Sequence, residues 1–141
     1  MAKTSSSKIR GAPGTTSART RTTPTRFPKS AAGAVRAALD KKAIDAVVLD
    51  LRKVGGFTDF FVICTGASQR QARAIADGVE LTLRTEFEER PHLSEGGGDS
   101  PWILLDYFNF VVHVFSPECR TFYDLERLWG NAERYEFSAQ D

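Results

Sequence analysis

Cysteine and histidine are scarce in this sequence of 141 residues, with two of each. Cys64 and Cys119 do not form a C-x-x-C pair, so we expect neither a disulfide scaffold nor a zinc site. This cysteine usage fits a reducing compartment. No apolar run approaches the ~20 residues that a membrane-spanning helix needs, and there is no apolar signal-peptide region. The sequence therefore predicts a cytoplasmic protein without a membrane partner.

Acidic residues are absent from positions 1–30, which hold seven Lys or Arg. The other twelve basic residues share positions 31–141 with all eighteen acidic ones, a balance of −6. Residues 1–30 are also rich in Ser, Thr and Pro and nearly free of large apolar side chains, so we expect a disordered basic tail. Residues 31–141 are expected to form one domain, whose charge suits a basic protein partner.

The tail leaves three roles open. It could remain solvated, or it could lie on ribosomal or other RNA. Its composition, rich in Arg and Ser and poor in acid, also resembles a transit peptide for a mitochondrion or plastid, although it has no clear amphipathic face.

A strand, a turn and a helix in succession organise the domain. Residues 60–64 form an apolar run typical of a buried strand. Ser68 follows a glycine-containing turn, and Gln71 three residues later completes a capping box, so we expect a helix over 68–88. The Gln71 side chain is expected to reach back to the backbone N–H of Ser68. Gly78, inside this helix, predicts close packing against the sheet.

The other elements are predicted from periodicity and breakers. They are a helix over 31–42 capped by Ser30, strands at 47–51, 102–106 and 110–115, a helix that begins after Ser116, and a further turn over 124–129. The two later strands are expected to form a hairpin. The order α-β-β-α-β-β-α predicts an α/β fold, with a mixed sheet of about four strands and helices packed on it.

The turn from Thr65 to Ser68 is the first candidate for a site with chemistry. A glycine before a helix N-terminus could hold phosphate, but no G-x-G-x-x-G or G-x-x-x-x-G-K-[ST] is present, so an ordinary turn is favoured. Asp50 and Asp106 stand alone in their strands, without the paired acids of a Mg²⁺ site. We expect Asp50 to end its strand or to pair with Arg52 or Lys53. No catalytic residues, metal or cofactor are predicted.

The hairpin from Trp102 to Phe115 is the best candidate for a binding surface. Alternation places Trp102, Leu104 and Asp106 on one face of their strand. It places Val111, His113 and Phe115 together on the next. Tyr107 and Phe108 fall at the connection, where aromatic rings are hard to bury. Two interpretations stay open, because these aromatics could form an interface or could pack under the C-terminal helices.

Five motifs together resemble the ribosomal silencing factor family, also called Iojap-like. They span Thr58–Gly66, Gln71–Asp77, Trp102–Tyr107, Val111–Phe115 and Phe122–Trp129. The resemblance covers about residues 32–137 and agrees in order and spacing. It departs from the family at Phe108-Asn109, where relatives commonly have Gly-Asp.

The resemblance implies a nucleotidyltransferase-like fold without known catalysis. It implies a translational repressor that binds the large ribosomal subunit through large-subunit protein fourteen and sterically blocks joining of the small subunit when nutrients are limiting. It assigns partner binding to Trp102 and, by extension, to Asp106, Tyr107 and His113. Relatives can pair as homodimers, and organellar relatives act in large-subunit assembly. The alternatives are therefore an organellar assembly factor and a nucleotidyltransferase-like enzyme that uses Asp50 or Asp106.

Overall fold

The computed structural model describes residues 27–97 and 99–138, so residues 1–26 of the tail predicted over 1–30 lie outside the described part. In chain order the elements are α1 (Lys29–Asp40), β1 (Ile44–Asp50), β2 (Phe60–Thr65), α2 (Gln69–Phe87), β3 (Leu93–Glu95), β4 (Trp102–Asp106), β5 (Phe110–Phe115), α3 (Pro117–Tyr123), α4 (Leu125–Leu128) and β6 (Glu133–Phe137). Among the described residues, none of the helices has the length and apolar character to cross a membrane.

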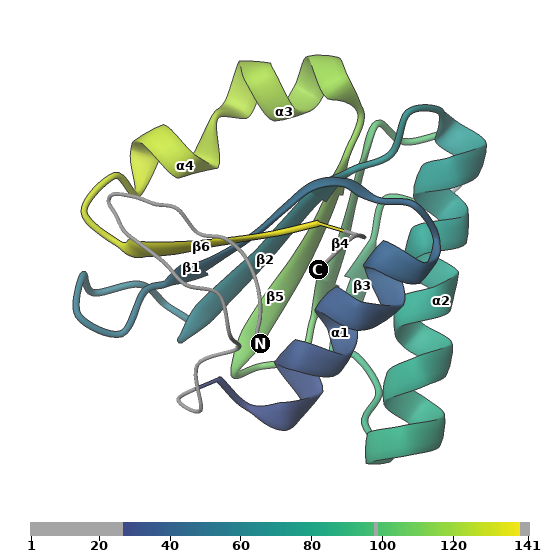
Figure 1. The fold of residues 1–141 in the computed structure, drawn as a ribbon, viewed down its shortest axis with the longest axis horizontal. Helices are drawn as coiled ribbons and strands as arrows, with labels where there is room; N and C mark the ends of the chain where they lie inside the picture. The colour runs from purple at the N-terminus through teal and green to yellow at the C-terminus, as the bar shows by residue number, and fades with distance from the viewer. Residues whose placement is uncertain (1–26, 98, 139–141) are drawn as a thin grey trace.

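The strands form one six-stranded mixed sheet in the order β3-β4-β5-β2-β1-β6 (Figure 1). Only the central pair, β2 and β5, is parallel, and β4 and β5 form the predicted antiparallel hairpin. The predicted α/β class is confirmed, but the expected count of about four strands is too low. The two strands that the sequence did not predict, β3 and β6, lie at the two edges.

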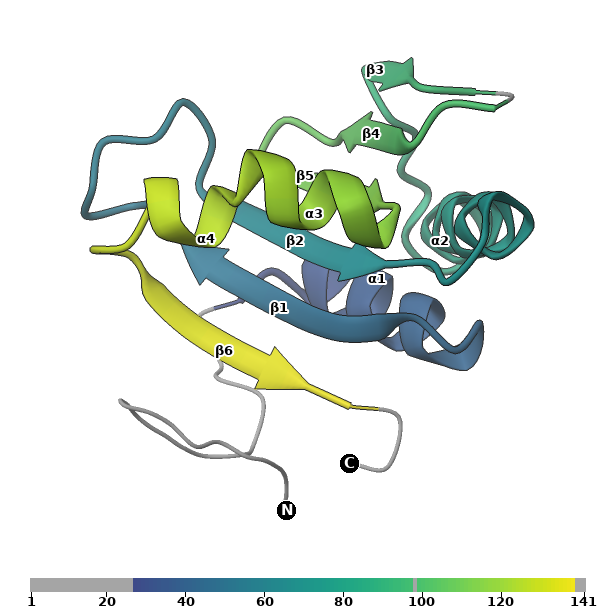
Figure 2. The same cartoon turned by 90° about the horizontal axis from the view of Figure 1, so that it is seen from above.

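Helices cover both faces of the sheet (Figure 2). Helices α1 and α2 lie side by side on one face, over buried side chains such as Phe60, Val62 and Cys64. The other face carries Phe61 and Phe115 and is covered by α3 and α4. The prediction of a buried strand from the continuous apolar run of residues 60–64 is confirmed, because β2 is buried along its whole length and has apolar side chains on both faces.

The predicted N-cap of α2 is confirmed, since the Ser68 hydroxyl accepts a hydrogen bond of 3.1 Å from the Gln71 N–H. The return contact differs from the prediction. The Gln71 side-chain oxygen accepts from the N–H of Ala67 at 2.6 Å, and its NH₂ donates to the carbonyl of Lys42 at 2.9 Å. Gln71 therefore joins the turn before α2 to the turn after α1. The prediction that Gly78 packs on the sheet is wrong, because a side chain there would meet Lys41.

The domain begins before residue 31. Phe27 is only 6% exposed and packs edge-to-face on Phe60 and Tyr135. Helix α1 begins at Lys29, and Ser30 is buried in its first turn without capping it. The predicted Ser30 cap is therefore wrong. The packed core includes Phe27, which precedes the boundary predicted at residue 30.

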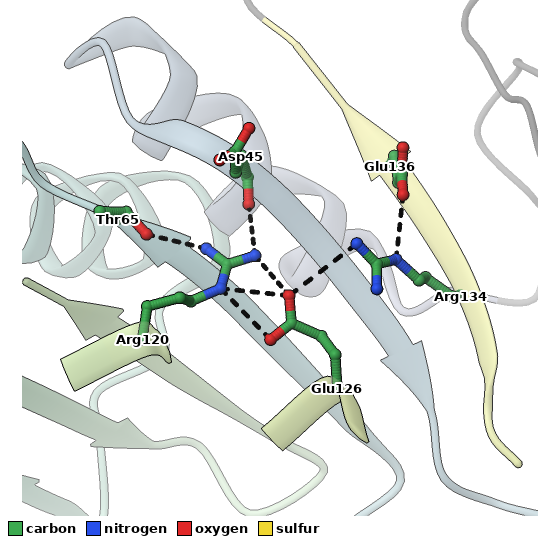
Figure 3. Close-up of polar contacts among 6 residues, drawn as sticks. All are labelled: Asp45, Thr65, Arg120, Glu126, Arg134 and Glu136. Carbon is green, nitrogen blue, oxygen red and sulfur yellow. Dashed lines mark hydrogen bonds and ion pairs between the residues drawn. The ribbon is translucent and has the colours of Figure 1, made fainter. Parts of the chain in front are cut away.

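Helices α3 and α4 contain no fully buried residue, and a polar cluster attaches them to the sheet (Figure 3). Arg120 donates to the Thr65 hydroxyl and to the Asp45 carbonyl, each at 2.9 Å. It also pairs with Glu126 at 2.6 Å. Asp45 has a φ of 52° beside a bulge in β1, and this local distortion accompanies the turn of its carbonyl toward Arg120.

Candidate functional site

Helices α3 and α4 leave one end of their sheet face uncovered. Residues paired across neighbouring strands share a face, so Leu93 lies beside Asp106 and Glu95 beside Leu104. With Trp102, these side chains lie on one face of β3 and β4. These are the two strands that lie beyond α3 in Figure 2. We call this surface of Trp102, Leu104, Asp106, Leu93 and Glu95 the β3–β4 face. Its members are half-buried or exposed, whereas Val111, His113 and Phe115 on β5 are buried.

Trp102 is held at the border between the covered and the open parts of this face. Its ring centroid lies 4.9 Å from that of Phe115, its partner across the hairpin, and 4.6 Å from that of Tyr123 on α3. Its indole N–H donates to Nδ1 of His113 at 3.1 Å. The ring is therefore fixed in direction while the residue stays partly accessible, which is the arrangement of a preorganised contact residue.

His113 lies beneath Trp102 and is 3% exposed. Burial lowers the pKa of its imidazole from 6.5 to about 4, so the ring is neutral at physiological pH. Because Nδ1 accepts from Trp102, the proton is on Nε2, which has no hydrogen-bond partner among the described residues. His113 can thus orient Trp102, but it is not accessible for direct contact.

Asp106 and Tyr107, the remaining predicted site residues, lie on opposite sides of the sheet at the turn after β4. Asp106 is half-buried on the β3–β4 face, and its carboxylate accepts from the Phe108 N–H at 2.8 Å. Phe108 is 72% exposed, as expected. Tyr107 is 4% exposed and stacks on Phe110 on the other side of the sheet, so the expectation that it is exposed is wrong. Burial, with Glu80 and Glu89 nearby, raises the pKa of its phenol.

The structure also bears on the two interpretations of the hairpin aromatics. Phe115 packs as core, whereas Trp102 stays partly accessible, so the aromatic residues divide between the two roles. Sequence reasoning missed Tyr123, Leu93 and Glu95, because a turn or a loop separates each from the hairpin along the chain. The adjacent aromatics Phe122 and Tyr123 in a helix with polar neighbours were the one available signal; both are exposed.

Asp50 and Asp106, the two candidate acids for enzyme chemistry, do not lie side by side in the sheet. Two strands, β2 and β5, separate Asp50 on β1 from Asp106 on β4. Asp50 instead accepts from the Arg52 side chain at 2.8 Å, as predicted. A side chain at Gly66 would lie 2.7 Å from the backbone of Ala72, so the turn before α2 is closed by packing. Within residues 27–97 and 99–138, no group of three acidic, His or Cys side chains could hold a metal ion.

A family model described as "Ribosomal silencing factor during starvation" matches residues 24–141. The chain belongs to this family. The predicted resemblance is thus confirmed, and the match begins within the predicted tail, just before the buried Phe27.

Named relatives of the silencing factor family agree with the match. The chain is 40% identical over 103 residues to the ribosomal silencing factor of Halalkalibacterium halodurans, covering 73% of this chain and 87% of that protein. It is 37% identical over 100 residues to the chloroplastic Iojap protein of Zea mays, covering 69% of this chain and 42% of that protein. A crystal structure of a Chromobacterium violaceum protein superposes with a TM-score of 0.68 at 35% identity, covering 72% and 84% of the two chains.

Membership of the silencing factor family supports a regulator of translation that associates with the ribosome. The named relatives are regulators, and this agrees with a candidate site that offers a contact surface. The β3–β4 face combines apolar side chains with two acidic groups, Glu95 and Asp106. A surface of this kind is complementary in character to a contact patch that is itself apolar and basic.

Proposed function

We propose that this protein represses translation by binding the large ribosomal subunit through large-subunit protein fourteen, so that its bulk blocks joining of the small subunit. The proposal places Trp102 and Asp106 in the contact surface and gives His113 the role of orienting Trp102. Tyr107, buried on the opposite side of the sheet, is left out of it. Steric blockade requires no catalytic group, so the proposal includes no reaction step.

The observation that carries this proposal is the partly accessible, fixed indole of Trp102 on an acidic part of the sheet. Aromatic residues that are held in place before binding lose little conformational entropy on association, and they dominate the binding energy of many interfaces. Ribosomal proteins face a strongly anionic RNA and tend to be basic, which complements Glu95 and Asp106. Complementary charge of this kind raises the rate of association more than the affinity.

Sedimentation of ribosomal subunits tests the blockade directly. Purified large and small subunits are mixed at physiological Mg²⁺ with and without an excess of this protein, and joined ribosomes are separated from free subunits on a gradient. We expect the protein to sediment with the large subunit and to reduce the joined fraction. If joined ribosomes form equally well in its presence, the proposed blockade is wrong.

Substitution of Trp102 tests the contact surface. We expect Trp102→Ala to weaken binding to the large subunit by about 2 kcal/mol or more, because the central indole contact is lost. Leu81→Ala is the matched control, since Leu81 is 52% exposed on α2, on the other side of the sheet. Binding is measured by co-sedimentation over a range of protein concentrations, at a temperature where each variant is folded. Equal affinities of the two variants would remove Trp102 from the site.

A second candidate function is assembly of the large subunit inside an organelle. It is favoured by the similarity to a chloroplastic Iojap protein together with the basic, acid-free composition of residues 1–30. The bacterial silencing factors favour the cytoplasm instead. Determination of the N-terminal sequence of the mature protein separates the two, because an intact N-terminus argues against import.

A further inference from the structure

Phe108 has a backbone conformation that disfavours its own side chain. Its φ is 78°, in the left-handed region where an aromatic residue is strained and where glycine or asparagine is accommodated more easily. Three hydrogen bonds fix this conformation. The Phe108 N–H donates to Asp106 at 2.8 Å, its carbonyl accepts from the Thr58 hydroxyl at 2.8 Å, and the Asn109 N–H donates to the Tyr107 carbonyl at 2.9 Å.

The Phe108 side chain recovers little of this cost within the fold. It is 72% exposed, and the one aromatic contact of its ring among the described residues is with His92, at a centroid distance of 5.2 Å. An exposed phenyl ring adds little hydrophobic stabilisation, since that contribution scales with the apolar area removed from water. A strained residue that gains so little from packing points to a role outside the folding of the domain.

The position of Phe108 connects it with the β3–β4 face. Trp102, Leu104 and Asp106 occupy alternate positions along β4, and Phe108 lies two residues beyond the end of that strand. Asp106 joins the two parts physically, because its side chain lies on the face and accepts from the Phe108 N–H.

We propose that Phe108 is a specificity-determining contact residue that extends the β3–β4 face at the end of β4 and receives an apolar side chain from a basic protein partner. The proposal rests on the function proposed above, and it names a residue and a contact that the function alone does not require. The partner is expected to be basic because two acidic side chains, Glu95 and Asp106, lie on this face.

Three variants of Phe108 in the full chain separate contact from folding. Phe108→Gly and Phe108→Asn remove the ring and suit the left-handed backbone, so we expect a melting temperature equal to or above that of the wild type. Both should weaken binding to the large subunit about tenfold or more, if the ring is an interface anchor. Phe108→Tyr keeps the ring and the strain, and it should retain both the stability and the affinity of the wild type.

The outcomes distinguish this inference from the proposed function. If Trp102→Ala weakens binding and Phe108→Gly does not, the function stands and the role of Phe108 is wrong. If the wild-type protein does not bind the large subunit, both fail. A lower melting temperature for Phe108→Gly and Phe108→Asn would show that the ring serves folding, and would overturn the inference. A concentration-dependent dimer in light scattering that Phe108→Gly abolishes would identify a second copy as the occupant and would also overturn it.

Discussion

At the scale of single residues, the hydrogen bond between Trp102 and His113 connects a buried core residue with a residue of the contact surface. A buried imidazole that accepts from an indole N–H must stay neutral, because protonation would remove the acceptor and place a charge beneath the sheet face. The direction of the Trp102 ring therefore depends on the protonation state of His113.

We expect His113 to make stability depend on pH in a defined window. Its pKa is about 4 in the folded protein and 6.5 without burial. Between pH 6.5 and about 4 this imidazole is mostly protonated in the unfolded state and mostly neutral in the folded state. Its contribution to stability is therefore complete above pH 6.5 and is lost as the pH falls to about 4. The maximum loss is about 3 kcal/mol.

The His113→Phe variant isolates this effect, because the wild type and the variant have the same carboxylates and share their titration. The free energy of unfolding is measured by chemical denaturation at several pH values from 7.5 to 4. We expect the wild type to lose stability relative to the variant as the pH falls. A difference between the two proteins that is the same at every pH would contradict the assignment.

Neighbouring residues at the hairpin turn show what sequence alone leaves undecided. Tyr107 and Phe108 are adjacent aromatics of similar size, and composition gives no reason to treat them differently. The left-handed φ of Phe108 turns the chain so that Tyr107 points into the core under α2 while Phe108 points to solvent. The turn conformation depends on a hydrogen bond that Asp106 accepts and on one that Thr58 donates, and Thr58 comes from a distant part of the sequence.

At the scale of elements, the attachment of α3 and α4 rests on polar contacts as much as on burial. Arg120 and Glu126 are each 13% exposed at the side chain, and Arg120 reaches β1 and β2 through Asp45 and Thr65. Burial alone would raise the pKa of Glu126, but the hydrogen bonds and the charge of Arg120 lower it below its usual range. The same contacts place Tyr123, three residues after Arg120, against Trp102.

We expect Arg120→Gln to loosen these two helices. The loss of the contacts to Glu126, Thr65 and Asp45 should reduce the free energy of unfolding by about 1–3 kcal/mol, since partly buried acceptors lose their donor. Hydrogen exchange should become faster in the amides of α3 and α4 than in those of α2. Both quantities are measured on the full chain, by chemical denaturation and by mass spectrometry.

Arg36→Gln is the matched control for Arg120→Gln. Arg36 pairs with Glu86 across α1 and α2, but both side chains are about half exposed, so the expected cost is below about 0.5 kcal/mol. Equal costs for the two variants would show that the cluster around Arg120 is no stronger than an ordinary surface ion pair.

At the scale of the whole molecule, Phe27 sets the extent of the domain. We expect Phe27→Ala to lower the free energy of unfolding by about 3 kcal/mol or more, because a ring that is 6% exposed leaves a cavity against Phe60 and Tyr135. Phe57→Ala is the control, since the Phe57 ring is 77% exposed. Thermal and chemical unfolding provide the comparison, and a loss below about 1 kcal/mol for Phe27→Ala would contradict this role.

The long elements of the fold were predictable from local patterns, and the sheet edges were not. Strands β2, β4 and β5 and helix α2 carry strong periodic or continuous apolar signals, and Ser68 and Ser116 cap the helices predicted after them. Strand β3 is three exposed residues between loop segments. Strand β6 alternates charged residues with Tyr135 and Phe137. Each of these edge strands has only one neighbouring strand, so its residues need little apolar character.

The sequence by itself determined the α/β class, the hairpin, the charge balance and the face shared by Trp102, Leu104 and Asp106. These follow from periods of 2 and 3.6 residues and from short-range capping and turn chemistry, which act within a few positions. Only the tertiary structure decided that His113 is buried beneath Trp102, that Tyr107 is core while Phe108 is exposed, and that Phe27 belongs to the domain. Each of these depends on contacts between distant segments, whose geometry no local pattern contains.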